Sequence, residues 1–298
     1  MSWRTPKNEI LIAVIGVTGA GKTTFISRAT GNTDLEIGRG LESCTKDVLP
    51  VPCTIDGTRV VLIDTPGFDD TYESDADIMQ LIANYLATTY ERKIFLSGLI
   101  LLQPITGNRI TGSERRRTAL FKDIMGPGAY RRVMIGTTMW SQIRNQDDAN
   151  RHVYERLTRG DAWEDMRDGG ANVMRHDDTS ASAVWIVKML MTPGNEVILQ
   201  MQEELAAHDM CIWRTSAGKR VDEDLGKEVL RLRRDLHGLQ RDSSAQQTEI
   251  QGLTQRLSGL ELQKSKPFFL DNSAYSGVQE VTTSHELLLQ LKHRRRSC

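Results

Sequence analysis

The sequence predicts an α/β domain of three layers, in which helices cover both faces of a mostly parallel sheet, followed by a C-terminal helical and coiled-coil extension. Short apolar runs alternate with segments of helical periodicity, a pattern typical of parallel sheets. The first apolar run ends in a glycine-rich loop that opens a helix, and a leucine heptad pattern begins near residue 225. We therefore expect three parts: residues 1–192, residues 193–264 and an irregular tail at 265–298.

The first strand is predicted from Ile10 to Ile15, an apolar, β-branched run suited to a strand that is buried on both faces. It leads into GVTGAGKTT, which satisfies G-x-x-x-x-G-K-[ST], and then into a helix predicted from Lys22 to Gly31. Glycines in such a loop let backbone N–H groups converge on an anion at the helix N-terminus. The pattern predicts a phosphate-binding loop (P-loop) whose binding residues are Gly16, Thr18, Gly19, Ala20, Gly21, Lys22, Thr23 and Thr24.

Two side chains of this loop have distinct expected roles. Lys22 should reach the β- and γ-phosphates as a catalytic residue, and the hydroxyl of Thr23 should bind Mg²⁺. A second motif, DTPG, follows a strand predicted over Thr58–Ile63. Its Asp64 is a candidate ligand for nucleotide and metal, because P-loop enzymes keep a magnesium contact at the carboxyl end of such a strand. Gly67, which lacks a Cβ, can bring its N–H close to a γ-phosphate in catalysis. An ordinary turn is the alternative interpretation of DTPG.

The glycine-rich polar stretch from Asp34 to Lys46 contains a third candidate, Thr45. In P-loop switches a threonine in this stretch closes over Mg²⁺ and the γ-phosphate and is released after hydrolysis. We therefore predict Thr45 as a catalytic residue and, with Thr23 and Asp64, as a metal ligand.

The rest of the first part continues the alternation of strands and helices. Further strands are predicted over Asp47–Ile55, joined to Thr58–Ile63 by an Asp-Gly hairpin turn, and over Gly98–Gln103, Tyr130–Thr138 and Ala171–Arg175. Further helices are predicted over Asp75–Tyr90, Gly112–Met125 with Ser113 as the cap, Asp147–Arg159 and Ala181–Met191.

With these motifs in place, the chain resembles the septin-related GTPases. GVTGAGKTT, the stretch SCTK and DTPGFDD are most similar to the motifs of the immunity-associated (AIG-type, or GIMAP) and chloroplast import-receptor groups, and Arg109-Ile110-Thr111 resembles their R-[FY]-T box. The resemblance covers roughly Glu9 to Met191. It implies a molecular switch that binds GTP or GDP with Mg²⁺, hydrolyses GTP, and forms a homodimer or oligomer through the GTPase domain and the coiled coil.

One motif departs from that family. The box that reads guanine is T-[KRH]-x-D in the immunity-associated group, and its Asp accepts hydrogen bonds from the base. Here the sequence is TMWS, so Thr138 fits the first position and Ser141 replaces the Asp. Losing a charge-assisted pair costs about 2–3 kcal/mol, which predicts a weak base preference and makes a base-unselective NTPase the alternative. Trp140 is a candidate for stacking on the base or is a partly buried aromatic, and Asp147 or Asp148 could substitute for the acid.

A second departure concerns the attacking water. Phe68 follows DTPG where small signalling GTPases carry a glutamine that orients this water. Phenylalanine cannot do so, and the resemblance implies a site that is completed by dimerisation across the nucleotide face. We therefore predict slow hydrolysis by the monomer and faster turnover, or retained nucleotide, on self-association. The stretch His176–Ser180 occupies the position of the loop that closes over the base.

The extension has a regular apolar pattern. Leucine, valine and isoleucine recur at spacings of four and three, with one polar layer at Ser243 and Gln246, over about five heptads: Leu225, Val229, Leu232, Leu236, Leu239, Ile250, Leu253, Leu257 and Leu260. This favours a coiled coil over an amphipathic helix packed on its own domain. The basic end KHRRRSC is typical of a solvated terminus; a weak membrane contact, or lipidation of Cys298, is the alternative.

Composition excludes several functional classes. A net charge of -1 and few aromatic residues argue against a nucleic-acid partner. The four cysteines show no spacing typical of zinc sites or disulfide frameworks. MSWRTPKNE is not an apolar signal region, and the longest apolar run is too short to span a bilayer, so we expect a cytoplasmic protein. Two alternatives remain. One is a coiled-coil scaffold with a structural nucleotide. The other is a P-loop kinase, which would need catalytic arginines, whereas Arg115–Arg117 are typical of a solvated helix face.

Overall fold

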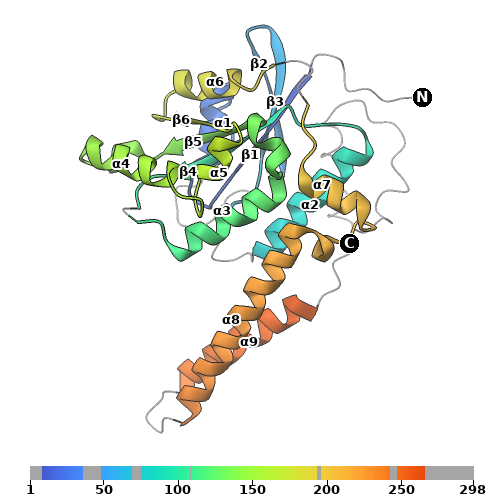
Figure 1. Cartoon of the computed structure of the whole chain (residues 1–298), viewed down its shortest axis with the longest axis vertical. Coiled ribbons are helices and arrows are strands. Elements are labelled where there is room, and N and C mark those ends of the chain that lie inside the picture. Colours follow the sequence, from blue (N-terminus) through green and yellow to red (C-terminus); the bar gives the residue numbers. More distant parts are fainter. Residues whose placement is uncertain are drawn as a thin grey trace.

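The computed structural model describes residues 9–35, 48–68, 75–107, 109–192, 196–241 and 247–265. In this part of the chain six strands form one sheet in the order β2-β3-β1-β4-β5-β6 (Figure 1). β2 pairs antiparallel with β3, and the other four pairings are parallel, which confirms the mostly parallel sheet. The strands are β1 (Glu9–Gly16), β2 (Leu49–Ile55), β3 (Thr58–Asp64), β4 (Gly98–Pro104), β5 (Val133–Thr138) and β6 (Asn172–Arg175).

Helices cover both faces of this sheet, and the side chains of β1 show the three layers directly. Ile10, Ile12 and Val14 pack in one apolar cluster with α1 (Lys22–Thr30) and α6 (Ser180–Lys188). The alternate residues Leu11, Ala13 and Ile15 pack in a second cluster, with α2 (Asp75–Glu91) and α3 (Gly112–Met125). Because successive side chains of a strand point to opposite faces, one continuous apolar run supplies both cores. The remaining helices are α4 (Gln146–Leu157), α5 (Glu164–Asp168), α7 (Gln200–Ala207), α8 (Ser216–Arg241) and α9 (Gln247–Ser265).

Several element boundaries differ from the sequence-based expectation, and two of the differences have a clear structural reason. The N-cap of α3 is Thr111, whose hydroxyl accepts a hydrogen bond from the Glu114 N–H at 3.1 Å, so the expectation of Ser113 is wrong. The third residue of the Arg109-Ile110-Thr111 box therefore starts this helix. Before β5, the segment Pro127–Arg132 forms a 3-10 helix, and the strand begins at Val133 rather than Tyr130.

The apolar cluster on the α2 and α3 face of the sheet also includes residues after residue 192. Val197 forms an antiparallel bridge with Leu96, and the side-chain amide of Gln202 in α7 donates to the Leu86 carbonyl of α2 at 3.1 Å. Apolar residues of α7 and of the start of α8 join the cluster on the α2 and α3 face: Leu199, Met201, Leu205, Ile212, Ala217 and Val221. The first turns of α8 therefore belong to the α/β domain.

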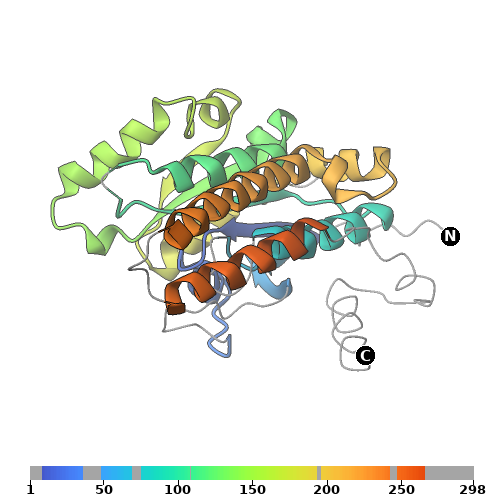
Figure 2. The same ribbon diagram turned by 90° about the horizontal axis from the view of Figure 1, so that it is seen from below.

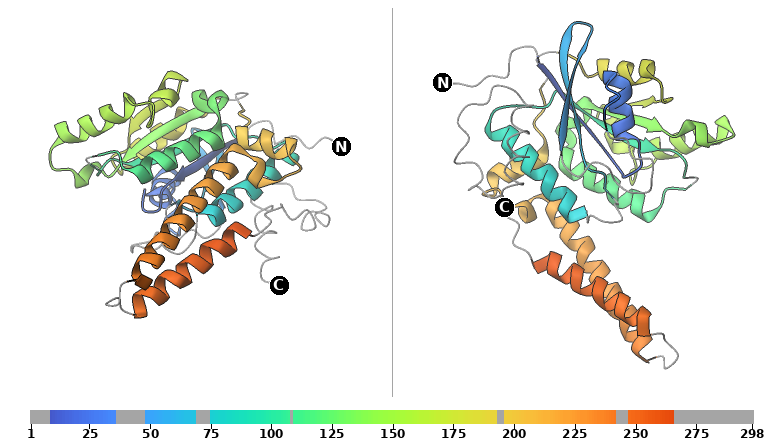
Figure 3. Two further views of the ribbon diagram at one scale, coloured as in Figure 1. Left: turned by 60° about the horizontal axis from the view of Figure 1, so that its bottom comes forward. Right: turned by 180° about the vertical axis from the view of Figure 1, so that it is seen from behind.

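The heptad region is a hairpin of two helices. α9 runs back alongside α8 and both extend away from the sheet (Figures 1, 2 and 3). Arg233 of α8 donates to the Glu261 carboxylate of α9 through Nε at 3.1 Å, and Arg256 lies 3.6 Å from Glu228. The two halves of the predicted heptad seam therefore lie against each other within the chain, and a coiled coil with another chain stays a prediction. In the described residues, no helix is long and apolar enough to cross a membrane.

Candidate functional site

The P-loop connects the end of β1 to the start of α1. Gly19 and Gly21 have φ angles of 77° and 89°, the left-handed region that side chains disfavour. At Gly16 an added Cβ would lie 2.5 Å from the Leu102 carbonyl oxygen of β4, so this position needs glycine for a close approach. The three glycines thus give the loop the turns that a phosphate-binding loop requires.

Lys22 lies in the curve of this loop. Its side chain is almost completely buried, and its ammonium group donates to the carbonyl oxygens of Gly16 at 3.2 Å and Val17 at 3.0 Å. The loop therefore holds one positive charge at the N-terminus of α1, where the helix dipole also favours an anion. This arrangement agrees with the phosphate-binding role expected for Lys22.

Thr23 and Asp64 come together from different elements. The Thr23 hydroxyl, in the first turn of α1, donates to a carboxylate oxygen of Asp64 at 2.7 Å, and Asp64 ends the buried strand β3. A hydroxyl and a carboxylate are hard oxygen donors, which Mg²⁺ binds together with water and substrate phosphates rather than in an all-protein cage. No cluster of three or more His, Cys, Asp or Glu side chains suited to a metal occurs among the described residues. The donor set fits magnesium.

The DTPG segment packs directly on the P-loop. Thr18 donates its backbone N–H to the Phe68 carbonyl at 2.8 Å and its hydroxyl to the Gly67 carbonyl at 3.0 Å. Thr65 donates its hydroxyl to the Val14 carbonyl of β1 at 2.9 Å. An added Cβ at Gly67 would lie 2.5 Å from the Thr18 nitrogen, so only glycine allows this approach. The predicted γ-phosphate sensor therefore contacts the predicted phosphate loop.

Gly67→Ala is expected to push these two segments apart. Overpacking of this kind typically costs about 1–3 kcal/mol, so we expect lower stability together with weaker triphosphate binding. Thermal unfolding and nucleotide titration of the purified variant would measure both effects. Gly128→Ala is the matched control, because an added Cβ there has no neighbour within 4 Å. Equal behaviour of the two variants would contradict the role of Gly67.

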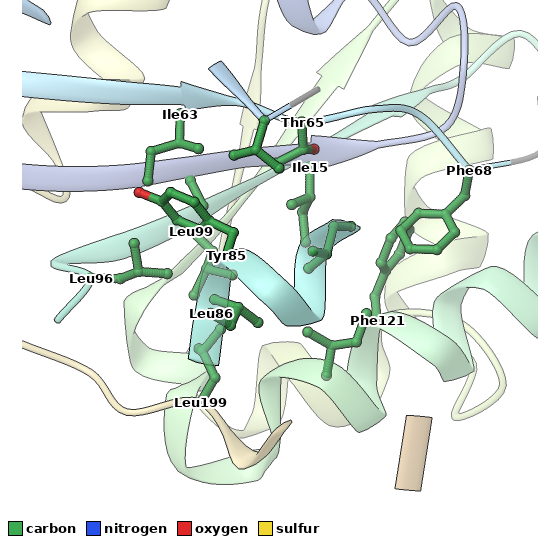
Figure 4. A pocket seen from close by; sticks show the side chains of 14 residues that line it. Ile15, Ile63, Thr65, Phe68, Tyr85, Leu86, Leu96, Leu99, Phe121 and Leu199 are labelled. Atoms are coloured by element: carbon green, nitrogen blue, oxygen red, sulfur yellow. The ribbon is translucent and has the colours of Figure 1, made fainter. Parts of the chain in front are cut away.

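The side chain of Phe68 lies in the apolar cluster on the α2 and α3 face of the sheet. It is 1% exposed, and its ring meets Phe121 of α3 edge-on with centroids 5.3 Å apart. Figure 4 shows both rings beside a small apolar cavity of about 20 Å³ between β1, β3 and α2. The side chain at this position is thus a core residue and is unable to orient a water molecule.

A larger cavity of about 500 Å³ opens beside the P-loop. Its polar lining comes from the ends of β5 and β6 and the segments that follow them, and the Thr138 hydroxyl ties β5 to the P-loop by donating to the Ala20 carbonyl at 3.1 Å. The lining residues are Ala20, Gly21, Thr24, Thr138, Met139, Trp140, Ser141, Ile143, Arg144, Gln146, Arg175, His176, Asp177 and Asp178. The cavity therefore unites Thr24, Thr138 and Trp140 with the His176–Ser180 loop, as expected for a base-binding site.

Trp140 lines this cavity and is itself largely buried. It is 7% exposed, its indole N–H donates to the Thr137 carbonyl at 3.0 Å, and the Arg175 guanidinium lies 4.3 Å from the centre of its ring. Of the two interpretations, a buried aromatic and a stacking platform, the structure supports the first, because Arg175 covers the ring.

The acidic residues of the cavity are not the ones suggested by the sequence. Asp147 and Asp148 lie in the first turn of α4 outside the lining, and Asp148 pairs with Arg151 at 2.7 Å. Asp177 and Asp178, in the loop after β6, line the cavity instead. Hydrogen bonds from Ser182 and Thr179 lower the pKa of Asp177 to about 2, so it is a carboxylate at neutral pH.

The same loop is anchored by His176. Its ring packs edge-on against Phe25 of α1 at 5.1 Å, and its Nδ1 lies 2.8 Å from the Ser182 hydroxyl. Burial lowers the pKa of His176, which favours the neutral imidazole. Thr45, the remaining predicted catalytic residue and metal ligand, falls outside the described residues, as does Cys298.

Comparison with known proteins agrees with this geometry. Residues 11–107 match the family model described as 50S ribosome-binding GTPase. GTP-binding protein A of Dictyostelium discoideum is 26% identical over 139 residues, which cover 46% of this chain and 29% of that protein. GTPase Der of Buchnera aphidicola is 38% identical over 61 residues, or 20% of this chain and 13% of that protein. The matches thus span less than a third of these relatives.

The solved structures show the same fold over a longer stretch. A dimerization-deficient mutant of Toc33 from Arabidopsis thaliana covers 64% of this chain and 88% of its own, with a TM-score of 0.51 and 12% identity. Toc33 in complex with GDP and Mg²⁺ covers 63% and 86%, with a TM-score of 0.50 and 14% identity. This chain has the fold of a P-loop GTPase domain.

Sequence reasoning missed several residues on the base side of this GTPase domain. Arg175 was predicted only as the last residue of a short strand, and Met139, Arg144 and Gln146 were assigned no role. The one available signal was topological. In a parallel sheet, the residues after neighbouring strands meet at the same edge, so β6 brings Arg175 beside the segment after β5.

Proposed function

We propose that this chain binds GTP and GDP with Mg²⁺, hydrolyses GTP slowly and acts as a self-associating molecular switch of the AIG-type group in the cytoplasm. The observation that carries the proposal is the convergence of the Lys22 ammonium and the Thr23–Asp64 pair on one P-loop within a GTPase fold. The Toc33 structure with GDP and Mg²⁺, which has the same fold, supports the choice of nucleotide and metal.

The chain's own groups would stabilise charge during hydrolysis. The magnesium ion, held by Thr23 and Asp64 with Thr45, would neutralise charge on the β- and γ-phosphates. Water attacks the γ-phosphorus, the bond to the bridging oxygen breaks, and inorganic phosphate and GDP form. Lys22 and the loop N–H groups bind the phosphate oxygens, and the Gly67 N–H contacts the γ-phosphate.

Slow turnover follows from Phe68. Because its side chain is buried against Phe121, the residue after DTPG leaves the orientation of the attacking water to another group. A second copy of the chain facing the nucleotide would supply that group. The α8–α9 hairpin, which projects from the domain, offers a further surface for self-association.

GTP turnover per subunit is the test of this function. We expect it to rise with protein concentration as the chain self-associates, and to disappear in Lys22→Ala. The measurement is phosphate release across a wide concentration series, with light scattering to follow assembly. Turnover per subunit that stays flat would contradict self-association, and turnover equal to that of Lys22→Ala would leave the scaffold with a structural nucleotide as the better explanation.

A further inference from the structure

The candidate acceptors on the base side of the cavity include Ser141, Asp177 and Asp178. Ser141 replaces the acid that reads guanine in related proteins. Asp177 accepts hydrogen bonds from the N–H and the hydroxyl of Thr179, at 3.3 and 2.7 Å. Asp178 lies 3.7 Å from Arg28 of α1. Both carboxylates of the loop thus have partners within the chain.

Arg175 is the donor best placed to meet a base. Its guanidinium lies over Trp140, with its centre 4.3 Å from the middle of the ring, and Nη1 donates to the Gln146 side-chain oxygen at 3.0 Å. Trp140 is held in turn by the Thr137 carbonyl and packs against Ile105. Arg175 is nevertheless an exposed residue that lines the cavity. Among the described residues, the hydrogen bond of its guanidinium is made through Nη1, so Nε and Nη2 can donate to a ligand in the cavity.

We propose that Arg175 determines base specificity, by donating to the O6 and N7 acceptors of a 6-oxopurine. Arginine recognises guanine through these two acceptors, whereas adenine presents an amino donor at position 6 and is rejected. This inference rests on the proposed nucleotide-binding function. In the related GTPases an acid binds N1 and the 2-amino group of guanine. Here a cation would bind the edge of the base that carries O6 and N7.

A comparison of guanine with hypoxanthine tests which edge of the base the site binds. Hypoxanthine has the O6 and N7 acceptors of guanine but lacks the 2-amino group. A site that reads O6 and N7 binds GDP and IDP equally and rejects ADP. A site in which Asp177 or Asp178 reads the amino group instead binds IDP more weakly than GDP, because a charge-assisted hydrogen bond is lost.

The experiment is a calorimetric titration of the full chain with GDP, IDP and ADP, each with Mg²⁺. For the wild type we expect GDP and IDP affinities within about twofold and ADP at least about tenfold weaker. Arg175→Gln should bring GDP and ADP within about twofold of each other, and Arg175→Lys, which keeps the charge without the planar fork, should be intermediate. Arg151→Gln is the matched control, since Arg151 is an exposed arginine of α4 outside the lining, and it should keep the wild-type ratios.

Three results would overturn the inference while leaving the phosphate site intact: a wild type that prefers GDP over IDP at least about tenfold, a wild type without preference between GDP and ADP, or an Arg175→Gln variant that keeps the preference. Binding of all three nucleotides no tighter than in Lys22→Ala would instead refute the proposed function, and the inference with it. The thermal midpoint of each variant, measured alongside, identifies loss of folding.

Discussion

Lys22→Ala is expected to weaken binding of GTP and GDP by between about tenfold and about a hundredfold, since a hydrogen bond to a charged group is worth about 1.5–3 kcal/mol. In the structure the ammonium group lies inside the P-loop and is held by the carbonyl oxygens of Gly16 and Val17. Its removal leaves the loop N–H groups as the main source of positive potential, so hydrolysis should fall at least as far as binding.

Titration with fluorescent GTP and GDP analogues, together with phosphate release, would measure this loss. Lys188→Ala is the matched control, because Lys188 is a lysine of α6 that pairs with Asp56 on the β2–β3 turn at 2.7 Å. Wild-type affinity in Lys22→Ala would contradict the assignment of the P-loop as the phosphate site. Equal losses in both variants would point to a general effect of charge.

Arg156→Ala is expected to destabilise the domain by about 3–5 kcal/mol, because it leaves a buried carboxylate without its partner. Arg156 is 1% exposed and binds Glu114 of α3 through two nitrogens, at 2.6 and 3.0 Å. A third nitrogen donates to the His152 carbonyl at 2.9 Å. The pair joins α4 to α3, so its loss should loosen α4, which flanks the cavity lining. Since whole domains are stable by only about 5–15 kcal/mol, a large fraction of the total is at stake.

Urea unfolding of the purified variants is the measurement. The double variant Arg156→Met, Glu114→Leu should recover most of the loss, because apolar residues of similar volume often replace a buried ion pair without cost. Arg151→Ala is the control on the same helix: Arg151 pairs with Asp148 at the surface, where such pairs are worth about 0–1 kcal/mol. A loss in Arg156→Ala no larger than in Arg151→Ala would refute the argument.

The phosphate side of the site was predictable because its requirements are local. Gly19 and Gly21 are needed for backbone conformations that few other residues adopt, and Lys22 and Thr23 follow them directly along the chain. Asp64 was found for a similar reason: it ends a buried strand, and the carboxyl end of that strand faces the P-loop. The structure brings together each predicted phosphate and metal residue that lies in its described part.

The extension shows where a periodic pattern stops being informative. Leucines at spacings of four and three predict that a helix packs against another helix. The pattern does not show whether that second helix comes from the same chain or from another chain. In the structure α9 lies against α8 of the same chain, with Arg233 paired to Glu261. The choice between the two kinds of partner depends on the free energy of the whole packed structure.

The sequence by itself determined the α/β fold, the P-loop and the Thr23–Asp64 pair. Local backbone preferences and the alternation of strands with helices along the chain are enough to specify them. Only the tertiary structure decided what lies around the base. Trp140 and Arg175 are separated by a helix-containing connection, and they meet because β5 and β6 are neighbours in the sheet. Because the Trp140 indole is buried under Arg175, a ligand in the cavity meets the Arg175 guanidinium rather than the face of the indole ring. Contacts between residues distant in the chain depend on the free energy of the whole fold, and no local pattern encodes them.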